Sequence, residues 1–107
     1  MYIRTSGNTT KYFIVNGSGN VGIGNSALET WKSGFTALQI GGSGSVVATT
    51  TQADGSILHL SNNAYYDNTN TRWEYMSTNA DDEATNYYQQ DGIHAFRTNN
   101  TAGSDDA

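Results

Sequence analysis

Short apolar runs recur along this chain at intervals of roughly ten residues, and residues that favour turns separate them. The separators include Asn16-Gly17, Gly41-Gly42, Asp54-Gly55 and Asp91-Gly92. Gly, Asn and Asp accept the positive φ that tight turns require, so these pairs are strong hairpin signals. We therefore predict an all-β fold of short strands and turns, with strands at residues 11–15, 35–40, 45–50, 56–60, 72–78, 84–89 and 93–98.

The composition supports ordered β structure. Ser, Thr, Asn and Gly make up 48 of the 107 residues, whereas charged residues make up only 14%. The polarity therefore comes from neutral side chains, and aromatic residues reach 11%, which is unlike a disordered chain. Proline is absent. Since proline removes a ladder donor, its absence permits nearly continuous strand pairing.

The chain divides into two parts of different character. Residues 1–24 include a glycine-rich stretch, in which residues 20–24 alternate small and β-branched side chains, and we predict a stem or connector there. We predict a β-rich domain for residues 25–107, with a frayed or truncated C-terminal end. At most one short helix is expected, over residues 27–33, with Asn25 or Ser26 as N-cap and Gly34 at its end.

Several predicted strands carry bulky side chains on both faces. In the strand at 56–60, Leu58 and Leu60 share one face, and Ile57 and His59 share the other. A small chain buries a low fraction of its own surface, so it cannot cover both faces of its strands. The second apolar face must then be covered by another chain. Identical chains around an axis supply that cover and protect sheet edges, and we expect a homotrimer.

The charge pattern argues against a nucleic-acid or membrane partner. The net charge is -5 and the five basic residues are scattered, whereas phosphate binding needs clustered Lys and Arg. No apolar run approaches the ~20 residues of a membrane span, so no membrane insertion is expected. No secretion signal is recognisable at the start of the sequence.

No motif predicts a catalytic, cofactor-binding or metal-binding residue. Residues 17–22 match G-x-G-x-x-G, but residues 23–25 would break the helix that this motif opens, and the acidic residue for the ribose is missing. Residues 67–70 lack the glycine and glutamate of an EF-hand and predict an Asx-rich turn. His59 and His94 lie far apart, and an ion held by one of them with its symmetry mates on a trimer axis stays an alternative. No pattern pairs two carboxylates for glycoside hydrolysis.

Aromatic residues concentrate in the second half of the chain, among Asn, Gln and Asp. Aromatic faces beside amides suit sugar binding, and they suit a β core or a subunit interface equally well. The candidate glycan or interface contacts are Tyr65, Tyr66, Trp73, Tyr75, Tyr87 and Tyr88.

Three motifs resemble those of bacteriophage tail-fibre proteins. Asn20-Val21-Gly22-Ile23-Gly24 resembles an N-V-G-I-G element that often precedes an intramolecular chaperone domain in such fibres. The segment from Leu60 to Asp67 resembles L-S-N-N-A-Y-Y-D, and the segment from Tyr87 to Gly92 resembles Y-Y-Q-Q-D-G. The resemblance covers residues 35–103 together with the first element.

The resemblance implies an elongated, intertwined homotrimer in the virion that contacts other virion proteins, serves in host attachment and has no catalytic residues. Its position, as a tail, neck or capsid fibre, is left open. The alternative function is a carbohydrate-binding module that recognises host surface polysaccharide through the aromatic residues. A glycan-degrading tailspike fragment is a third hypothesis.

Overall fold

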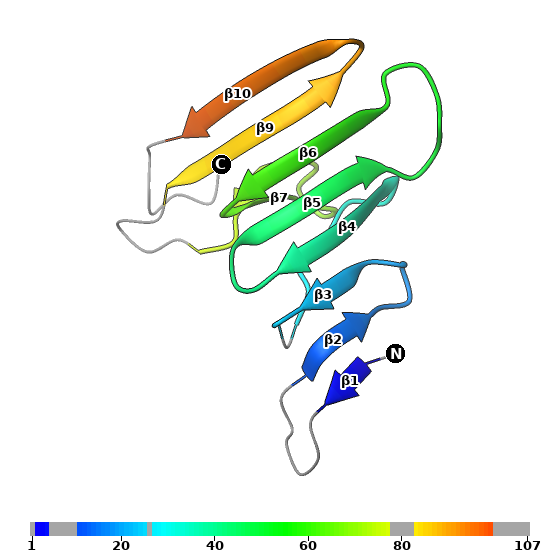
Figure 1. Cartoon of the computed structure of the whole chain (residues 1–107), viewed down its shortest axis with the longest axis vertical. Helices are drawn as coiled ribbons and strands as arrows, with labels where there is room; N and C mark the ends of the chain where they lie inside the picture. The colour runs from blue at the N-terminus through cyan, green and yellow to red at the C-terminus, as the bar shows by residue number, and fades with distance from the viewer. Residues whose placement is uncertain (1, 5–10, 26, 78–82, 100–107) are drawn as a thin grey trace.

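A computed structural model describes residues 2–4, 11–25, 27–77 and 83–99 of the chain (Figure 1). Strands make up 57% of these residues and none of them is helical, which confirms the all-β prediction. The strands are β1 (Tyr2–Arg4), β2 (Lys11–Val15), β3 (Val21–Ile23), β4 (Phe35–Ile40), β5 (Gly44–Thr49), β6 (Ile57–Asn62), β7 (Ala64–Tyr66), β8 (Trp73–Tyr75), β9 (Ala84–Gln90) and β10 (Ile93–Asn99).

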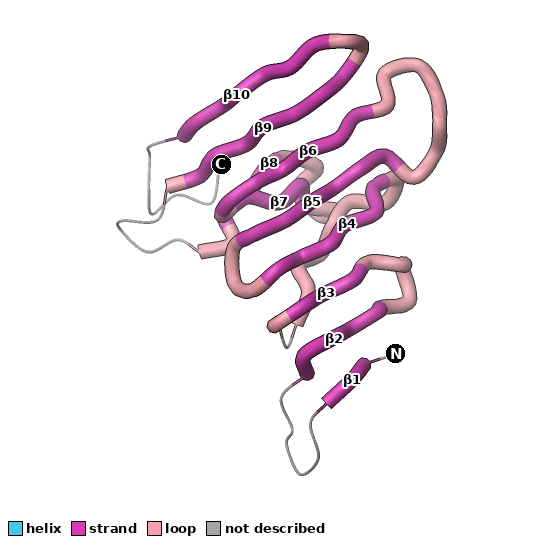
Figure 2. Tube along the Cα trace, in the orientation of Figure 1, coloured by secondary structure: helices cyan, strands magenta, loops and turns pink. Residues whose placement is uncertain are grey.

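The strands form two layers of unequal size. Eight of them make one sheet in the order β1-β2-β3-β4-β5-β6-β9-β10, and β7 pairs with β8 in a small separate ribbon. The ribbon lies on the far side of the large sheet in Figure 2 and contacts β5 and β9. The molecule measures 46 × 37 × 23 Å, and strands stack along its longest dimension (Figure 1).

The predicted turns form the predicted hairpins. Gln90 pairs with Ile93, so Asp91-Gly92 is a two-residue turn between β9 and β10. Both turn residues have positive φ, 50° and 76°, as a type I′ turn requires. Gly41 and Gly42 lie in the turn between β4 and β5, and Asp54-Gly55 lies in the loop between β5 and β6.

Most strand predictions agree with the structure to within one or two residues. The strands predicted at 11–15 and 35–40 have the observed bounds, and β9 and β10 each extend one residue beyond prediction. The strand predicted at 72–78 is limited to Trp73–Tyr75, and Thr78 lies outside the described residues. Three short strands, β1, β3 and β7, were not predicted.

The predicted helix at 27–33 is wrong. Asn25 accepts a hydrogen bond from the Ala27 amide, as a helix cap would, but two of the later amides in this segment bond to distant partners. The Glu29 amide donates to the Gln39 side chain at 3.1 Å, and the Lys32 amide donates to the Tyr66 carbonyl at 2.8 Å. Tertiary partners therefore replace the i to i−4 bonds that a helix of two turns would need. Ser26 lies outside the described residues.

The first three strands continue the sheet of the second part of the chain. β3 pairs in parallel with β4, and Asn20, which precedes β3, is buried. Its Oδ1 accepts a hydrogen bond from the Ala37 amide at 2.9 Å, so the start of β3 is joined to β4 by a side chain as well as by the ladder. Strands from both parts of the chain thus share one sheet, and the separate roles of residues 1–24 and 25–107 as stem and fibre domain stay a prediction.

The core lies between the large sheet and the β7–β8 ribbon. Its buried apolar members are Trp31, Ala37, Val47 and Tyr65, and Phe35, Trp73 and Met76 pack against them. A second cluster joins Ala64, Tyr75 and Ala84 at the side of the ribbon. All of these side chains lie on one face of the sheet, which we call the covered face. The opposite face is called the open face.

Candidate functional site

The structure divides the six candidate aromatic residues between the two faces of the sheet. Tyr65 and Tyr75 are buried in the core. Trp73 and Tyr88 pack against His59 on the covered face, and Tyr66 packs against Trp73 in the same cluster. Tyr87 points to the open face, because adjacent residues of a strand point to opposite faces. The six residues do not form one patch.

The cluster around His59 is densely packed. The His59 ring lies 4.8 Å from Trp73 and 5.7 Å from Tyr88, measured between ring centroids. Its Nδ1 is 3.1 Å from Oδ1 of Asn86. Burial lowers the pKa of His59 below its usual 6.5 and the positive charge of Arg97 adds to the effect, while the Asn86 hydrogen bond opposes it. His59 is therefore a neutral core residue at pH 7.

A recess of about 270 Å³ adjoins this cluster, lined by residues of the ribbon and of strands β9 and β10. Trp73, Asn86, Arg97 and Asn99 are among the described residues that line it. The guanidinium of Arg97 lies 4.4 Å above the Tyr88 ring and donates to the Tyr88 hydroxyl at 3.1 Å. Arg97 has no carboxylate partner in the part of the chain that the structure describes.

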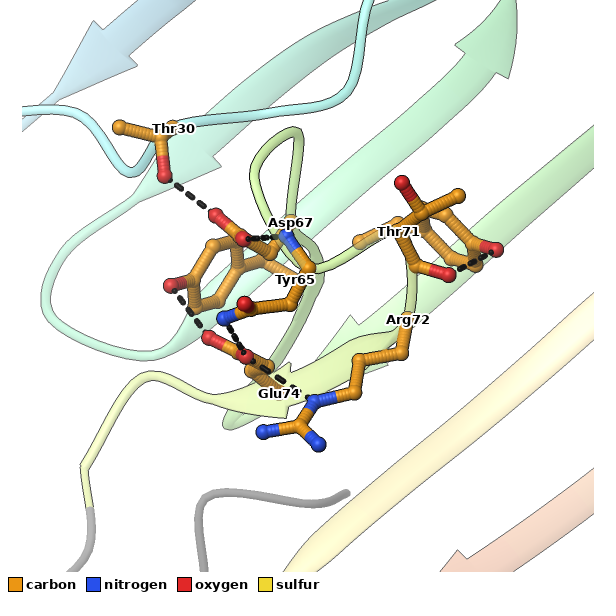
Figure 3. A network of polar contacts seen from close by, with 8 residues as sticks. Thr30, Tyr65, Asp67, Thr71, Arg72 and Glu74 are labelled. Atoms are coloured by element: carbon orange, nitrogen blue, oxygen red, sulfur yellow. Dashed lines mark hydrogen bonds and ion pairs between the residues drawn. The ribbon is translucent and has the colours of Figure 1, made fainter.

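A polar network ties the ribbon to the segment before β4 (Figure 3). The Thr30 hydroxyl donates to Oδ1 of Asp67 at 2.5 Å, and the Asn70 amide donates to Oδ2 at 2.6 Å. These two bonds hold the pKa of Asp67 below its usual 3.8. Residues 67–70 therefore form an Asx-type turn, as predicted, that also anchors the ribbon.

Glu74 forms the second half of this network (Figure 3). Its carboxylate accepts hydrogen bonds from the Tyr65 hydroxyl at 3.1 Å, the Asn70 amide group at 2.6 Å and the Arg72 Nε at 3.1 Å. Burial, together with the bond to Glu74, raises the pKa of Tyr65 to about 12. Burial and the charges of Asp67 and Glu74 also raise the pKa of Glu29. The carboxylates of Asp67 and Glu74 both accept hydrogen bonds from protein donors, so the network holds the fold together.

The open face carries a continuous line of apolar side chains. Each member is directly opposite the next on the neighbouring strand, so all of them point the same way. The line crosses seven strands from β2 to β10. We call it the apolar row, and it consists of Val15, Val21, Leu38, Val46, Leu60, Tyr87 and Phe96.

The described chain leaves much of this face accessible to solvent. Phe96 is 82% exposed and Leu60 is 56% exposed, and neighbouring Ile23, Ile40 and Leu58 are also exposed. None of the residues that β3, β4, β5, β6, β9 and β10 place on this face is charged. Large apolar side chains are thus gathered on a neutral surface, which is the usual property of an interaction site.

Sequence reasoning missed the apolar row as a unit, although it identified Leu58 and Leu60 as a second apolar face. The turn at Asp91-Gly92 was enough to place Tyr87 opposite Phe96. The parallel pairing of β3 with β4 and the pairing of β6 with β9 left no local signal, so the full row could not be assembled.

Other kinds of site have little support in the described residues. They contain no group of three or more His, Cys, Asp or Glu side chains that could hold a metal ion, and no helix long and apolar enough to cross a membrane. His59 and His94 point to opposite faces of the sheet. No protein-family model, curated protein or solved structure matches the chain.

Proposed function

We propose that the chain is a structural, non-enzymatic segment of a bacteriophage fibre, which assembles as a homotrimer and contributes to host attachment in the virion. The observation that carries the proposal is the open face with its apolar row. The three motifs that resemble phage tail-fibre proteins supply the link to a virion.

The open face favours assembly because its apolar row is continuous and because the residues that β3, β4, β5, β6, β9 and β10 place there carry no charge. Soluble monomers rarely expose contiguous apolar patches larger than a few hundred Å². Burying apolar surface stabilises by about 25 cal/mol per Å². A charged partner would gain nothing from this face, whereas a second copy presents the same neutral row. Identical copies therefore fit it well, even though each carries a net charge of -5.

The fibre-like motifs coincide with positions that build this surface and its support. In the L-S-N-N-A-Y-Y-D segment, Leu60 belongs to the apolar row and Tyr65 belongs to the core. In the Y-Y-Q-Q-D-G segment, Tyr87 belongs to the row and Asp91-Gly92 forms the turn after it. These motif residues thus serve architecture, which agrees with a structural role.

Native mass spectrometry of the full chain at micromolar concentration tests the assembly. We expect a species of three times the 11.5 kDa chain mass. A monomer under these conditions would overturn the homotrimer.

Antibodies raised against the chain test the virion role, and we expect them to label an appendage of phage particles and to block adsorption. Particles that lack the chain altogether would overturn that role.

A second candidate function, binding of a host surface glycan, is favoured by the recess beside Trp73. A volume of about 270 Å³ suits a single sugar ring, and Asn86 and Arg97 offer polar groups beside the indole. Trp73 also packs on His59, so truncating it would disturb the core. The sharper test on a glycan array is Arg97→Gln, with Lys32→Gln as a variant of equal net charge. Loss of binding in Arg97→Gln alone supports the recess, and no binding by the unmodified chain excludes it.

A further inference from the structure

We propose that the three-fold axis of the assembly runs along the direction in which the strands stack, with the apolar row of each copy facing the axis. This inference rests on the homotrimer proposed above and adds its geometry. The fibre axis would then lie perpendicular to the strands, and the three sheets would form the sides of a triangular prism.

The shape of the apolar row supports this direction. One residue of the row comes from each of seven successive strands, and neighbouring strands lie about 4.8 Å apart, so the row is roughly 29 Å long. The row is therefore a narrow stripe that follows the stacking direction. Stripes of this form can meet along their whole length only when the copies are aligned side by side.

The positions beside the row are mixed in character. On one side Ile40 is followed by Gly44, Asn62, Thr85 and Thr98 on successive strands. On the other side Ala48 and Leu58 are followed by Gln89 and His94. Two flat sheets packed face to face would bury these polar groups against each other, at a cost for every unpaired one. In a prism only the middle of each sheet reaches the centre, so the stripe is the most enclosed part of the face and the positions beside it lie nearer the corners.

The strand length also fits three sheets. β4, β5 and β6 each have six residues, which corresponds to about 20 Å. A triangle with sides of about 20 Å has its centre about 6 Å from each side. Packed sheets lie about 10 Å apart, so one layer of side chains fills about 5 Å. One apolar side chain per sheet therefore fills the centre of such a prism at each level.

The available area is sufficient for a stable contact. The seven strands that carry the row together cover roughly 600 Å² per copy in projection, and the accessible area is larger because the side chains project from the sheet. A standard interface buries about 800 Å² per partner. The open face is thus large enough for specific assembly with second copies of this chain.

Single engineered cysteines test the direction of the axis, because the chain has no cysteine of its own. Val21→Cys, Leu60→Cys and Phe96→Cys place a thiol near one end of the row, towards its middle and at its other end. Thr69→Cys places one on the exposed turn of the ribbon, on the covered side. Each variant is checked for native-like circular dichroism and trimer mass and is then treated with a short tris-maleimide, which links three thiols that surround one axis.

We expect a covalent trimer on a denaturing gel for all three row variants and none for Thr69→Cys. Trimers by mass without covalent trimers at the row would overturn the inference and leave the homotrimer intact. Linking at one row position only would also overturn it, because the axis would then cross the row. A monomer by mass would remove the homotrimer itself, and a dimer linked along the row would exclude the prism.

Discussion

Asn63 is the residue at which the chain leaves the large sheet to form the ribbon. It is buried and has a φ of 55°, in the left-handed region that few residues other than Gly, Asn and Asp adopt. Its Oδ1 accepts from the Ser77 amide at 2.7 Å, and its Nδ2 donates to the Ser77 carbonyl at 3.1 Å. The neighbouring Asn62 is exposed on the open face.

Replacing Asn63 with Ala should therefore destabilise the fold far more than replacing Asn62. We expect Asn63→Ala to lower the free energy of unfolding by about 2–3 kcal/mol, because the partly buried Ser77 backbone groups lose their bonds and Ala disfavours positive φ. Asn62→Ala should change it by less than about 0.5 kcal/mol. Urea titrations followed by circular dichroism measure both. Equal effects of the two variants would contradict the role given to Asn63.

His59 should make the stability of the fold depend on pH. Its folded-state pKa is lowered, so the folded state binds fewer protons than the unfolded state below pH 6.5. The stabilisation is fully present above pH 6.5 and is lost as the pH falls through the folded-state pKa. We expect the Tm to fall as the pH is lowered from about 6.5 to about 5, and the fall to be smaller in His59→Gln. An identical fall in both proteins at equal concentration would show that His59 is not responsible.

At the scale of single elements, the β9–β10 hairpin depends on its two-residue turn. Gly92 has a φ of 76° and nothing lies within 4 Å of a Cβ added there, so a substitution there is opposed by backbone strain alone. We expect Gly92→Ala to cost about 1 kcal/mol. Asp91→Asn should be neutral or slightly stabilising, because Asn accepts this conformation readily. Thermal unfolding compares the two variants, and a harmless Gly92→Ala would contradict the type I′ assignment.

Elements with strong local signals were the ones that could be predicted. Strand β4 has turn residues on both sides, and β9 and β10 are joined by an Asp-Gly pair, so their positions follow from local chemistry. β3 is only three residues long and is stabilised by a parallel neighbour distant in sequence. The segment at 27–33 has helix-like caps, but bonds to Gln39 and Tyr66 determine its conformation.

At the scale of the whole molecule, the open face should control assembly without affecting the fold of each copy. Leu60 and Ile93 are similarly exposed, at 56% and 60%, but Ile93 lies on the other face of the sheet. We expect Leu60→Glu to convert the proposed trimer to monomers, because three carboxylates would meet near its axis. Ile93→Glu should leave the trimer unchanged. Light scattering with circular dichroism measures both, and a trimeric Leu60→Glu would contradict the assigned interface.

The candidate aromatic site illustrates what local sequence could reveal at this scale. Alternation along a strand was enough to separate Tyr87 from Tyr88. The burial of Tyr65 and Tyr75 could not be predicted from local sequence. It depends on the turn at Asn63, which places the ribbon against the large sheet, and on Trp31, which packs on Tyr65 from a loop far away in sequence.

The order of the strands also has a mechanical consequence. β1 and β10 form opposite edges of the large sheet, and ladder hydrogen bonds between antiparallel strands run perpendicular to the strands. Tension that pulls the two edges apart therefore acts on every ladder of hydrogen bonds in turn. The strands of a single chain would separate one after another, beginning with the short pairings of β1, β2 and β3. The tensile strength of a fibre built this way must come from contacts between copies along the apolar row.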